Sequence, residues 1–353
     1  MHVLTGKKRV RIRFWICLLV LFYSSGCATT IKTNVLMPGN IDRAAQFKNV
    51  AVLPFEGPDG DTFTSAVEST LASVIIDGQQ FFQIVDRGSL DRVMNEMKLG
   101  MAGTVNEETA AQVGKAVGAN GVYAGTINTS SVSEEFYFEK RQTCSFYRTA
   151  IDSKGGKTQE CASWYDAQVS CTRRTAAFSF TPKLIEVESG RIIFSNTYEN
   201  KVESKVCADD GRFLDDGTVM QKKVQETVMH KFRMDVAPYY AMMSFTLKDS
   251  TAGISSDAAK AKLKEGVTFA KANRMDRACP IWREAMVLAP GSITLMYNVG
   301  ICDETEDRPH EALALYQQIE RSLASPDDLL TAALARVRAQ IENRRKLADQ
   351  VAR

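Results

Sequence analysis

The sequence predicts an α+β domain, built as a mixed sheet with flanking helices and a β-hairpin insertion, followed by an all-α domain of repeated helices. Three observations support this fold class. Apolar runs of strand length alternate with helical apolar periodicity over residues 47–249. Residues 257–345 carry helical periodicity alone and contain an internal repeat of 34 residues. A polar joint containing Gly and Ser, LKDSTAGISSD, separates the two parts near residue 250.

Residues 1–26 resemble a bacterial secretory signal peptide. Five cations between Lys7 and Arg13 precede the apolar run FWICLLVLF, residues 14–22, and no acidic residue occurs before Cys27. The run is shorter than the roughly 20 residues that span a bilayer as a helix. The SSGC motif that follows resembles a lipobox, although Ser24 stands where Leu is usual, and this resemblance implies lipidation of Cys27. The alternatives are a signal anchor, or ordinary cleavage that leaves a stray thiol.

Processing at Cys27 changes the charge and the expected location of the protein. Loss of the five cations lowers the net charge from +2 to about −3. The processed chain therefore has no excess of basic residues that would indicate nucleic-acid binding. Ala28 stands where inner-membrane lipoproteins often carry Asp, and the resemblance therefore implies an outer-membrane lipid anchor facing the periplasm. Residues 27–46 are expected to form a polar tether.

The remaining cysteines favour disulfides over a metal site. Six stay after processing, and an even number in an oxidising compartment is typical of paired cysteines. No Cys-x-x-Cys spacing occurs, and only His230 and His310 remain as histidines, so we expect neither zinc nor thiol-redox chemistry. The sequence also lacks the phosphate-loop, dinucleotide, nucleophile-elbow and His-Glu-x-x-His motifs. We therefore expect a non-enzyme without cofactors.

The elements of the first domain follow from periodicity and turn residues. The helix before Gly118 can be capped by Thr104 or Asn106, with Glu107 and Glu108 in its first turn. The first half of the domain is expected to contain a strand at 49–55, a helix at 63–77, a strand at 81–85, a helix at 90–97, the capped helix and a strand at 121–127. The second half is expected to contain extended stretches at 175–187 and 191–204, a helix at 218–235 and a strand at 240–247.

Three segments of this domain resemble the family of the curli-secretion lipoprotein CsgG and its periplasmic relatives. They are VAVLPF from residue 50, FFQIVDRGSLDRVMNEMKL from residue 81 and AAQVGKAVGANGVYAGTI from residue 110. The resemblance is good over residues 48–130 and loose over 175–247. Within it, Asp86 is expected to cap a helix and Arg87 to form a structural ion pair.

The resemblance raises the alternative of a ring-forming outer-membrane secretion channel. In CsgG, two hairpins per subunit enter the membrane, and the corresponding region here is the insertion 129–217. A membrane strand needs about ten residues of alternating apolar and polar character. EEFYFEKRQ and CTRRTAAFSF do not sustain that alternation, and KVESKVCADDGRFLDDG is strongly charged. The insertion also contains four cysteines, so the channel is the second interpretation.

Hairpin symmetry predicts how those four cysteines pair. Cys171 and Cys207 are equidistant from residue 189, inside the turn sequence ESG, and Cys144 and Cys161 are centred beside the turn sequence DSKGG. Directly opposed residues of antiparallel strands lie close enough for a disulfide. We therefore expect Cys144–Cys161 and Cys171–Cys207 as staples of two hairpins. Pro182 implies a bend or an edge strand within one arm.

The second domain contains two aligned units, residues 259–292 and 293–326. Gly266 matches Gly300, Ala278 matches Ala312 and Trp282 matches Tyr316, which resembles tetratricopeptide (TPR) repeats. In this architecture Cys279 and Cys302 lie on neighbouring helices, and we expect a disulfide between them; the alternative is two small buried hydrophobic residues. A terminal helix follows Ser325, and its polar end is expected to fray.

Paired repeat helices present a concave face that can bind a protein. By repeat position, this face is expected to contain Lys260, Val267, Lys271, Tyr297, Ile301 and Glu304. The sequence therefore predicts a non-catalytic, outer-membrane-anchored assembly or adaptor lipoprotein that recruits a protein partner through the repeats and can form homo-oligomers. The alternative is that this face has no binding role and is a solvated surface in which two apolar residues are covered by the last helix.

Overall fold

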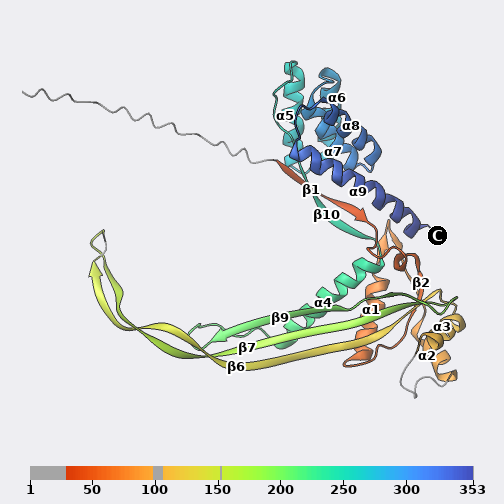
Figure 1. The fold of residues 1–353 in the computed structure, drawn as a ribbon, viewed down its shortest axis with the longest axis vertical. Helices are drawn as coiled ribbons and strands as arrows, with labels where there is room; N and C mark the ends of the chain where they lie inside the picture. The colour runs from red at the N-terminus through yellow and green to blue at the C-terminus, as the bar shows by residue number, and fades with distance from the viewer. Residues whose placement is uncertain (1–28, 98–105, 152, 353) are drawn as a thin grey trace, which may run out of the picture.

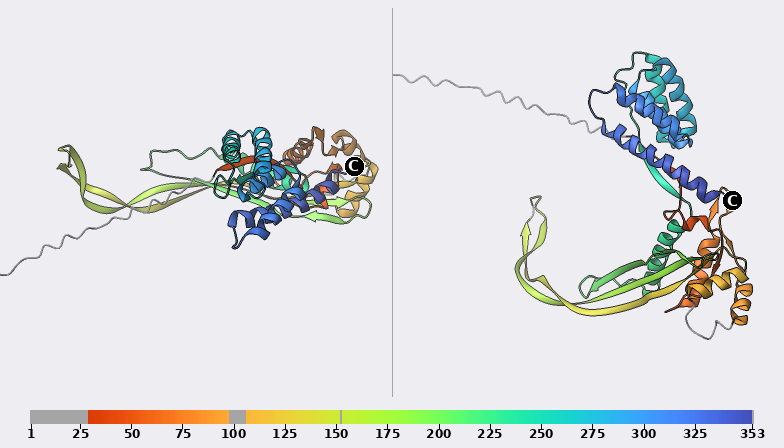
Figure 2. Two further views of the ribbon diagram at one scale, coloured as in Figure 1. Left: turned by 90° about the horizontal axis from the view of Figure 1, so that it is seen from above. Right: turned by 45° about the vertical axis from the view of Figure 1, so that its right-hand side comes forward.

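The computed structural model describes residues 29–97, 106–151 and 153–352 of the 353-residue chain. Its described part consists of a sheet domain with a long projecting arm, a helical domain and a two-stranded ribbon that joins them (Figure 1). The predicted signal peptide and Cys27 lie outside the described residues. The two further views show that the arm leaves the sheet domain as a narrow, curved ribbon (Figure 2).

The sheet domain is built around a mixed sheet, as the sequence predicts. The strand order is β5-β2-β6-β7-β8, and β9 also pairs with β7. β2 runs parallel to β5 and β6, whereas the pairs that involve β7 are antiparallel. The bounds are β2 Asn49–Val52, β5 Gln83–Ile84, β6 Gly121–Ile151, β7 Lys157–Glu186, β8 Ile192–Ser195 and β9 Tyr198–Cys207.

Helices cover both faces of this sheet because neighbouring strand residues point to opposite sides. Val50 and Val52 of β2 pack in one cluster with helices α1 (Gly60–Ala72) and α4 (Gly217–Val236). Ala51, between them, packs in a second cluster with α2 (Arg87–Glu96) and α3 (Glu107–Ala116). The strand thus buries both faces, which explains its nearly continuous apolar sequence.

The predicted turn before α2 is confirmed in detail. The side chain of Asp86 caps α2 by accepting a hydrogen bond of 2.9 Å from the backbone N–H of Ser89. Arg87 forms ion pairs with Glu68 of α1 at 3.1 Å and with Asp91 at 3.4 Å. The predicted helix 63–77 ends earlier, at Ala72, and is followed by the small hairpin β3 (Ile75–Ile76) and β4 (Gln79–Gln80).

The prediction of a tether over residues 27–46 is wrong for most of its length. Residues Thr30–Met37 form strand β1, which pairs antiparallel with β10 (Tyr239–Thr246), and a 3-10 turn, η1, covers Ala44–Gln46. The ribbon forms because Ile31 and Phe245, opposite each other, are buried in the core of the helical domain. From the sequence, this strand was expected to complete the first domain. In the structure β10 pairs with β1 instead and does not join the main sheet.

The arm is a single hairpin of two unusually long strands. β6 has 31 residues and β7 has 30, and they pair from Gly121 opposite Glu186 to Ile151 opposite Lys157. β9 accompanies β7 as far as the pair of Cys171 and Cys207. Two hairpins therefore share β7. Pro182 lies in the gap between two pairings of β7. Phe180 is the last residue of β7 that pairs with β9, and Lys183 is the first that pairs with β8. On this side of β7 no sheet hydrogen bond therefore requires the N–H that proline lacks.

The helical domain repeats one helix pair, which follows the predicted 34-residue period. The pairs are α5 (Asp257–Lys271) with α6 (Met275–Leu288) and α7 (Ile293–Thr305) with α8 (Pro309–Ser322), and α9 (Asp328–Val351) follows. A Cβ built on Gly266 would lie 2.3 Å from Nε1 of Trp282, and one built on Gly300 would lie 2.4 Å from Cε1 of Tyr316. The same glycine–aromatic contact thus closes both pairs.

The C-terminal end of α9 does not fray, contrary to the prediction from its polar sequence. Gln350 is fully buried and bonds both backbone groups of Gly39, by accepting from its N–H at 2.8 Å and donating to its carbonyl at 3.1 Å. Nζ of Lys48 donates to the carbonyl of Val351 at 3.0 Å, near the end of the helix. The helix therefore starts on the repeats and ends on the sheet domain.

Candidate functional site

The predicted concave binding face is largely inaccessible, which corrects the sequence interpretation. Val267 is 7% exposed, and Tyr297, Ile301 and Glu304 are at most 1% exposed. Of the two lysines predicted with them, Lys260 is half-buried and Lys271 is exposed. The face is covered by the chain itself, through the segment after β10 and through α9. From the sequence, covering by the last helix was only the alternative, and the segment after β10, which directly precedes α5, was assigned to a polar joint.

The segment after β10 occupies the repeat face much as a bound peptide would. The side chain of Asn298 donates to the carbonyl of Lys248 at 2.7 Å and accepts from its N–H at 3.0 Å. Nζ of Lys248 lies 5.3 Å from the centre of the Tyr297 ring and 2.6 Å from Asp327. These contacts fix the backbone and the charge of Lys248 on the repeats.

A buried ion pair joins α9 to the same face. Oε2 of Glu304 accepts a 2.8 Å hydrogen bond from Nε of Arg336, and its Oε1 accepts from Nη2 of Arg336 at 2.6 Å and from the hydroxyl of Tyr316 at 2.7 Å. Burial alone would lower the pKa of Arg336, but the hydrogen bonds and charge of Glu304 raise it above its ordinary value. Burial also raises the pKa of Tyr316. Removing one partner of such a pair leaves an uncompensated buried charge.

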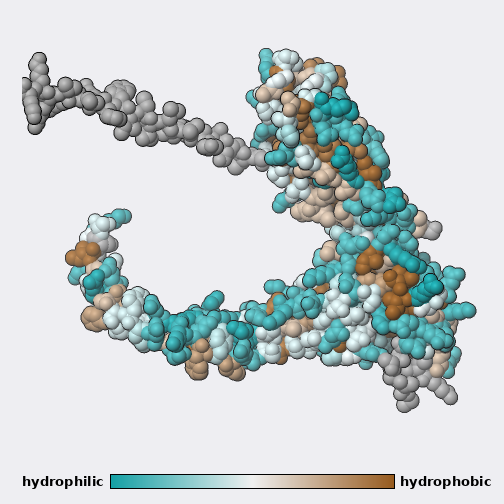
Figure 3. Space-filling model, viewed as in Figure 1, coloured by the Kyte–Doolittle hydropathy of each residue, from teal (hydrophilic) through white to brown (hydrophobic). Residues whose placement is uncertain are grey.

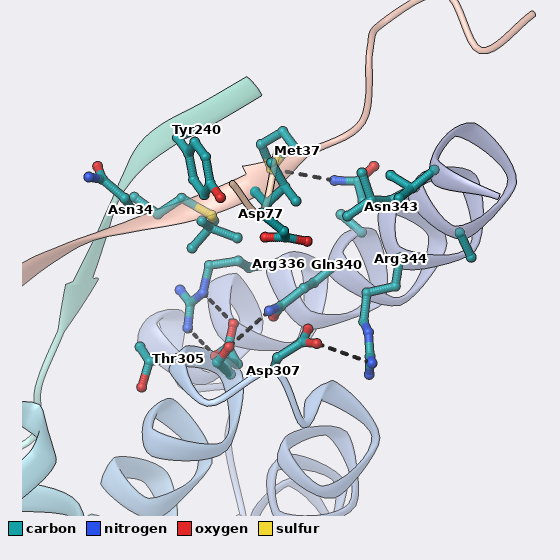
Figure 4. A pocket seen from close by; sticks show the side chains of 18 residues that line it. Asn34, Met37, Asp77, Tyr240, Thr305, Asp307, Arg336, Gln340, Asn343 and Arg344 are labelled. Atoms are coloured by element: carbon teal, nitrogen blue, oxygen red, sulfur yellow. Dashed lines mark hydrogen bonds and ion pairs between the residues drawn. The ribbon is translucent and has the colours of Figure 1, made fainter. Parts of the chain in front are cut away.

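Beside this ion pair lies an open groove, which is the candidate binding site (Figure 4). Its volume of about 560 Å³ falls within the usual range of ligand pockets. One wall is the ribbon, through Asn34, Val35, Leu36, Met37, Tyr240 and Met243, and the other is one stripe of α9, through Arg336, Ala339, Gln340, Asn343, Arg344, Leu347, Ala348 and Val351. Asn343 approaches the sulfur of Met37 at 3.9 Å, where the two walls converge.

Carboxylates lie at the rim of this groove. Asp307 forms an ion pair of 3.1 Å with Arg344, across from the ribbon. Asp77 lines the groove from the turn between β3 and β4, where its φ of 50° places the backbone in the left-handed region. In the part of the chain that the structure describes, the Asp77 carboxylate has neither a hydrogen bond nor an ion pair. The groove thus carries one uncompensated negative charge.

Sequence reasoning did not place a binding site between the ribbon and α9, and of the residues that it proposed for partner binding only Glu304 lines the groove. The residues of β1 were assigned to the tether, and the second half of α9 was expected to fray. One signal was available: Gln340, Asn343 and Leu347 recur at helical spacing, which indicates one continuous face. The partner of that face could not be found by pattern, because β1 lies some 300 residues away in the chain.

The arm is fastened to the sheet domain at its base and stapled near its far end. The structure joins Cys171 to Cys207 and Cys144 to Cys161, the pairs expected from hairpin symmetry, and it joins Cys279 to Cys302 between α6 and α7. Cys171 and Cys207 are directly opposed. Cys144 instead stands opposite Trp164, and irregular pairing beyond it brings the sulfurs together. The predicted strand register is therefore correct for Cys171–Cys207. For Cys144–Cys161 the pairing of the cysteines is as predicted, but the two residues are not directly opposed.

Charged groups reinforce the base of the arm. Arg141 donates to Asp209 at 2.8 Å and to Asp210 at 2.9 Å. The hydrogen bond from Arg141, together with one from the backbone N–H of Cys207, lowers the pKa of Asp210 to about 2. Glu139 brings a carboxylate near Cys171 and Cys207, but both sulfurs are consumed by the disulfide and offer no thiolate to a metal.

Apolar side chains remain exposed along the arm. Phe136 and Phe138 are 76% and 70% exposed, and Trp164 is 59% exposed. The space-filling view shows such residues as small separate patches within a mostly hydrophilic ribbon (Figure 3). In the described parts of the chain, no helix is both long enough and apolar enough to cross a membrane.

The comparisons with known proteins bear on the sheet domain. Residues 48–135 match the family described as curli production assembly/transport component CsgG. The match covers β2 through the first half of β6, with α1, α2 and α3, and it ends before the far part of the arm. The comparison with curated protein sequences finds no match.

Three solved structures are similar to parts of the chain. The LpoB C-terminal domain from Salmonella enterica is 14% identical, over 44% of this chain and 84% of that one, with a TM-score of 0.26. A PelC variant dodecamer from Paraburkholderia phytofirmans is 14% identical, over 60% and 99%, with a TM-score of 0.26. Lipoprotein GNA1162 from Neisseria meningitidis is 9% identical, over 52% and 96%, with a TM-score of 0.28.

Proposed function

We propose that the protein is a non-catalytic assembly or adaptor lipoprotein of the bacterial cell envelope. It is held at the outer membrane by acyl chains on Cys27, faces the periplasm and recruits a protein partner through its helical domain, whose repeats we assign to the TPR type. The export signal and the SSGC motif support the anchor, and the match of residues 48–135 to the CsgG family supports a role in envelope assembly or secretion.

The observation that carries the recruiting role is the groove between α9 and the ribbon. The concave repeat face is filled by Lys248 and by α9, so a partner does not reach it without displacing the chain. The groove, in contrast, is open, is walled by both domains and has an apolar lining with polar groups at its rim. A partner bound there contacts the sheet domain and the helical domain at the same time.

The anchor lies close to the start of the ribbon in this proposal. Cys27 precedes β1 by three residues, and the carbonyl of Thr29 already accepts a 2.7 Å bond from the N–H of Leu247. Three extended residues span at most about 10 Å. Lipidation of Cys27 therefore places the ribbon at the membrane surface without a long tether.

A photoreactive amino acid placed at Asn343, inside the groove, tests the recruiting role in intact cells. The matched control places it at Val287 of α6, which is 79% exposed and away from the groove. We expect one crosslinked protein that forms from the Asn343 position and not from the Val287 position. Identical products from both positions, or none from Asn343, would contradict recruitment by the groove.

One observation favours the second candidate, a ring-forming channel component. Beyond its short pairing with β2 and the isolated bridge at Thr126, the outer edge of β6 has no partner strand among the described residues. Such a long free edge can pair with a neighbouring subunit. The two candidates differ in assembly mass and in the detergent that the arm binds.

A further inference from the structure

The ribbon has a free strand edge whose hydrogen-bonding groups can be assigned. β1 and β10 form a sheet of two strands only, and residue numbers in each opposed pair sum to a constant. The bond between Leu247 and Thr29 continues this register, so the odd residues of β1 exchange hydrogen bonds with β10. The even residues Lys32, Asn34 and Leu36 consequently turn their backbone N–H and carbonyl groups outward.

The groove follows this edge of β1. Four consecutive residues, Asn34 to Met37, line it, and consecutive strand residues point to opposite faces. A recess that collects side chains from both faces of a strand runs along its edge. In the ribbon view, α9 lies on the β1 side of the ribbon, away from β10 (Figure 1), and the close-up shows Gln340, Asn343 and Arg344 on that helix around the recess (Figure 4).

A strand edge beside a helix specifies the kind of ligand. Unpaired backbone donors and acceptors are satisfied by another extended backbone, and alternate side chains of that segment then enter the recess. The apolar lining, which includes Met37, Tyr240 and Leu347, favours apolar side chains there. Asp77 favours a cation, because the other acidic groups at the groove, Glu304 and Asp307, are already paired with arginines.

We infer that an extended segment of the partner protein adds to the edge of β1 as a third strand, with alternating apolar side chains against α9 and one basic side chain at Asp77. This inference rests on the proposed recruiting function and names the chemistry of the partner. The opposite edge of the ribbon provides the internal comparison. There the even residues of β10, such as Met242, also turn their backbone groups outward, but Met242 is 67% exposed and does not line the groove.

Two proline variants test the strand edge with matched positions. Asn34→Pro removes an outward N–H of β1, whereas Met242→Pro removes the outward N–H of the residue directly opposite on β10. Neither N–H takes part in the ribbon's own hydrogen bonds. Both variants are made in the full chain with Cys27→Ala, and equal melting temperatures confirm that both fold.

The probe is a fluorescein-labelled eight-residue peptide of alternating Val and Thr with a single Lys, measured by fluorescence anisotropy. A second peptide replaces Lys by Glu. We expect the Lys peptide to bind the parent chain and the Met242→Pro variant alike, and Asn34→Pro to weaken binding by about tenfold or more. Asp77→Asn should remove the preference for Lys over Glu, since Asn tolerates the left-handed backbone.

Each other outcome overturns the inference in an identifiable way. Lack of binding by both peptides at millimolar concentration, undiminished binding to folded Asn34→Pro, or equal losses in both proline variants would exclude addition at β1. A concentration-dependent dimer that Asn34→Pro abolishes would assign the edge to a second copy of this chain. If Asn343 still crosslinks one envelope protein, the recruiting function stands and only the strand-addition mode fails.

Discussion

Two buried tyrosines of the sheet domain differ in whether their hydroxyl has a partner. Tyr123 is fully buried, and within the described chain its hydroxyl has no hydrogen bond. The hydroxyl of Tyr198 donates to Asp235 at 2.6 Å. Burial raises the pKa of both phenols above the ordinary value, so both are protonated at neutral pH. A buried polar group without a partner destabilises the folded state.

We expect Tyr123→Phe to leave the free energy of unfolding unchanged or to raise it by up to about 1 kcal/mol. Tyr198→Phe, the matched control, should lower it by about 1–3 kcal/mol, because a carboxylate loses its donor. Urea denaturation of both variants measures this difference. A loss of stability in Tyr123→Phe as large as that in Tyr198→Phe would show that the Tyr123 hydroxyl is bonded.

At the scale of the elements, the two helix pairs depend on glycines that admit an aromatic ring. Gly266→Ala and Gly300→Ala place a methyl group 2.3 Å and 2.4 Å from atoms of Trp282 and Tyr316. Overpacking of this kind costs about 1–3 kcal/mol of stability. Gly291, in the turn between the repeats, has no atom within 4 Å of an added Cβ, and Gly291→Ala is the control that should not destabilise. Equal effects at all three glycines would contradict the repeat packing.

The disulfides give a second prediction for the elements. Peptide mapping without reduction should recover 144 linked to 161, 171 to 207 and 279 to 302. The first two staples hold an arm that has little apolar core of its own. Crossed pairs, or free thiols at Cys279 and Cys302, would refute the registers of the arm or the packing of α6 on α7.

The sequence was informative where structure is local and periodic. The β2 strand, the Asp86 cap and the 34-residue repeat follow from neighbouring residues, and the turn at residue 189 sets the opposition of Cys171 and Cys207. The pairing irregularity beyond Cys144 had no comparable signal, because an inserted residue leaves the composition of a strand unchanged. The β1 strand depends on its pairing with β10, more than 200 residues away, and the docking of α9 depends on contacts more than 300 residues apart, such as Gln350 with Gly39.

At the scale of the whole molecule, α9 couples the two domains. Gln350→Ala leaves the N–H and carbonyl of Gly39 unpaired at a buried position, which costs about 1–3 kcal/mol. We expect this variant to separate thermal unfolding into two transitions and to expose the end of α9 to proteolysis. Asp349→Ala, at the exposed neighbouring position, should behave as the parent chain does. A single transition in both variants would exclude the coupling.

The adaptor and the channel make opposite predictions about mass. The most direct test is size-exclusion chromatography with light scattering on the acylated chain in detergent and on the Cys27→Ala chain without detergent. The adaptor predicts the same monomer or small oligomer in both, with detergent bound through the acyl chains alone. A large closed ring that binds detergent through residues 129–217 would contradict the adaptor and establish the channel.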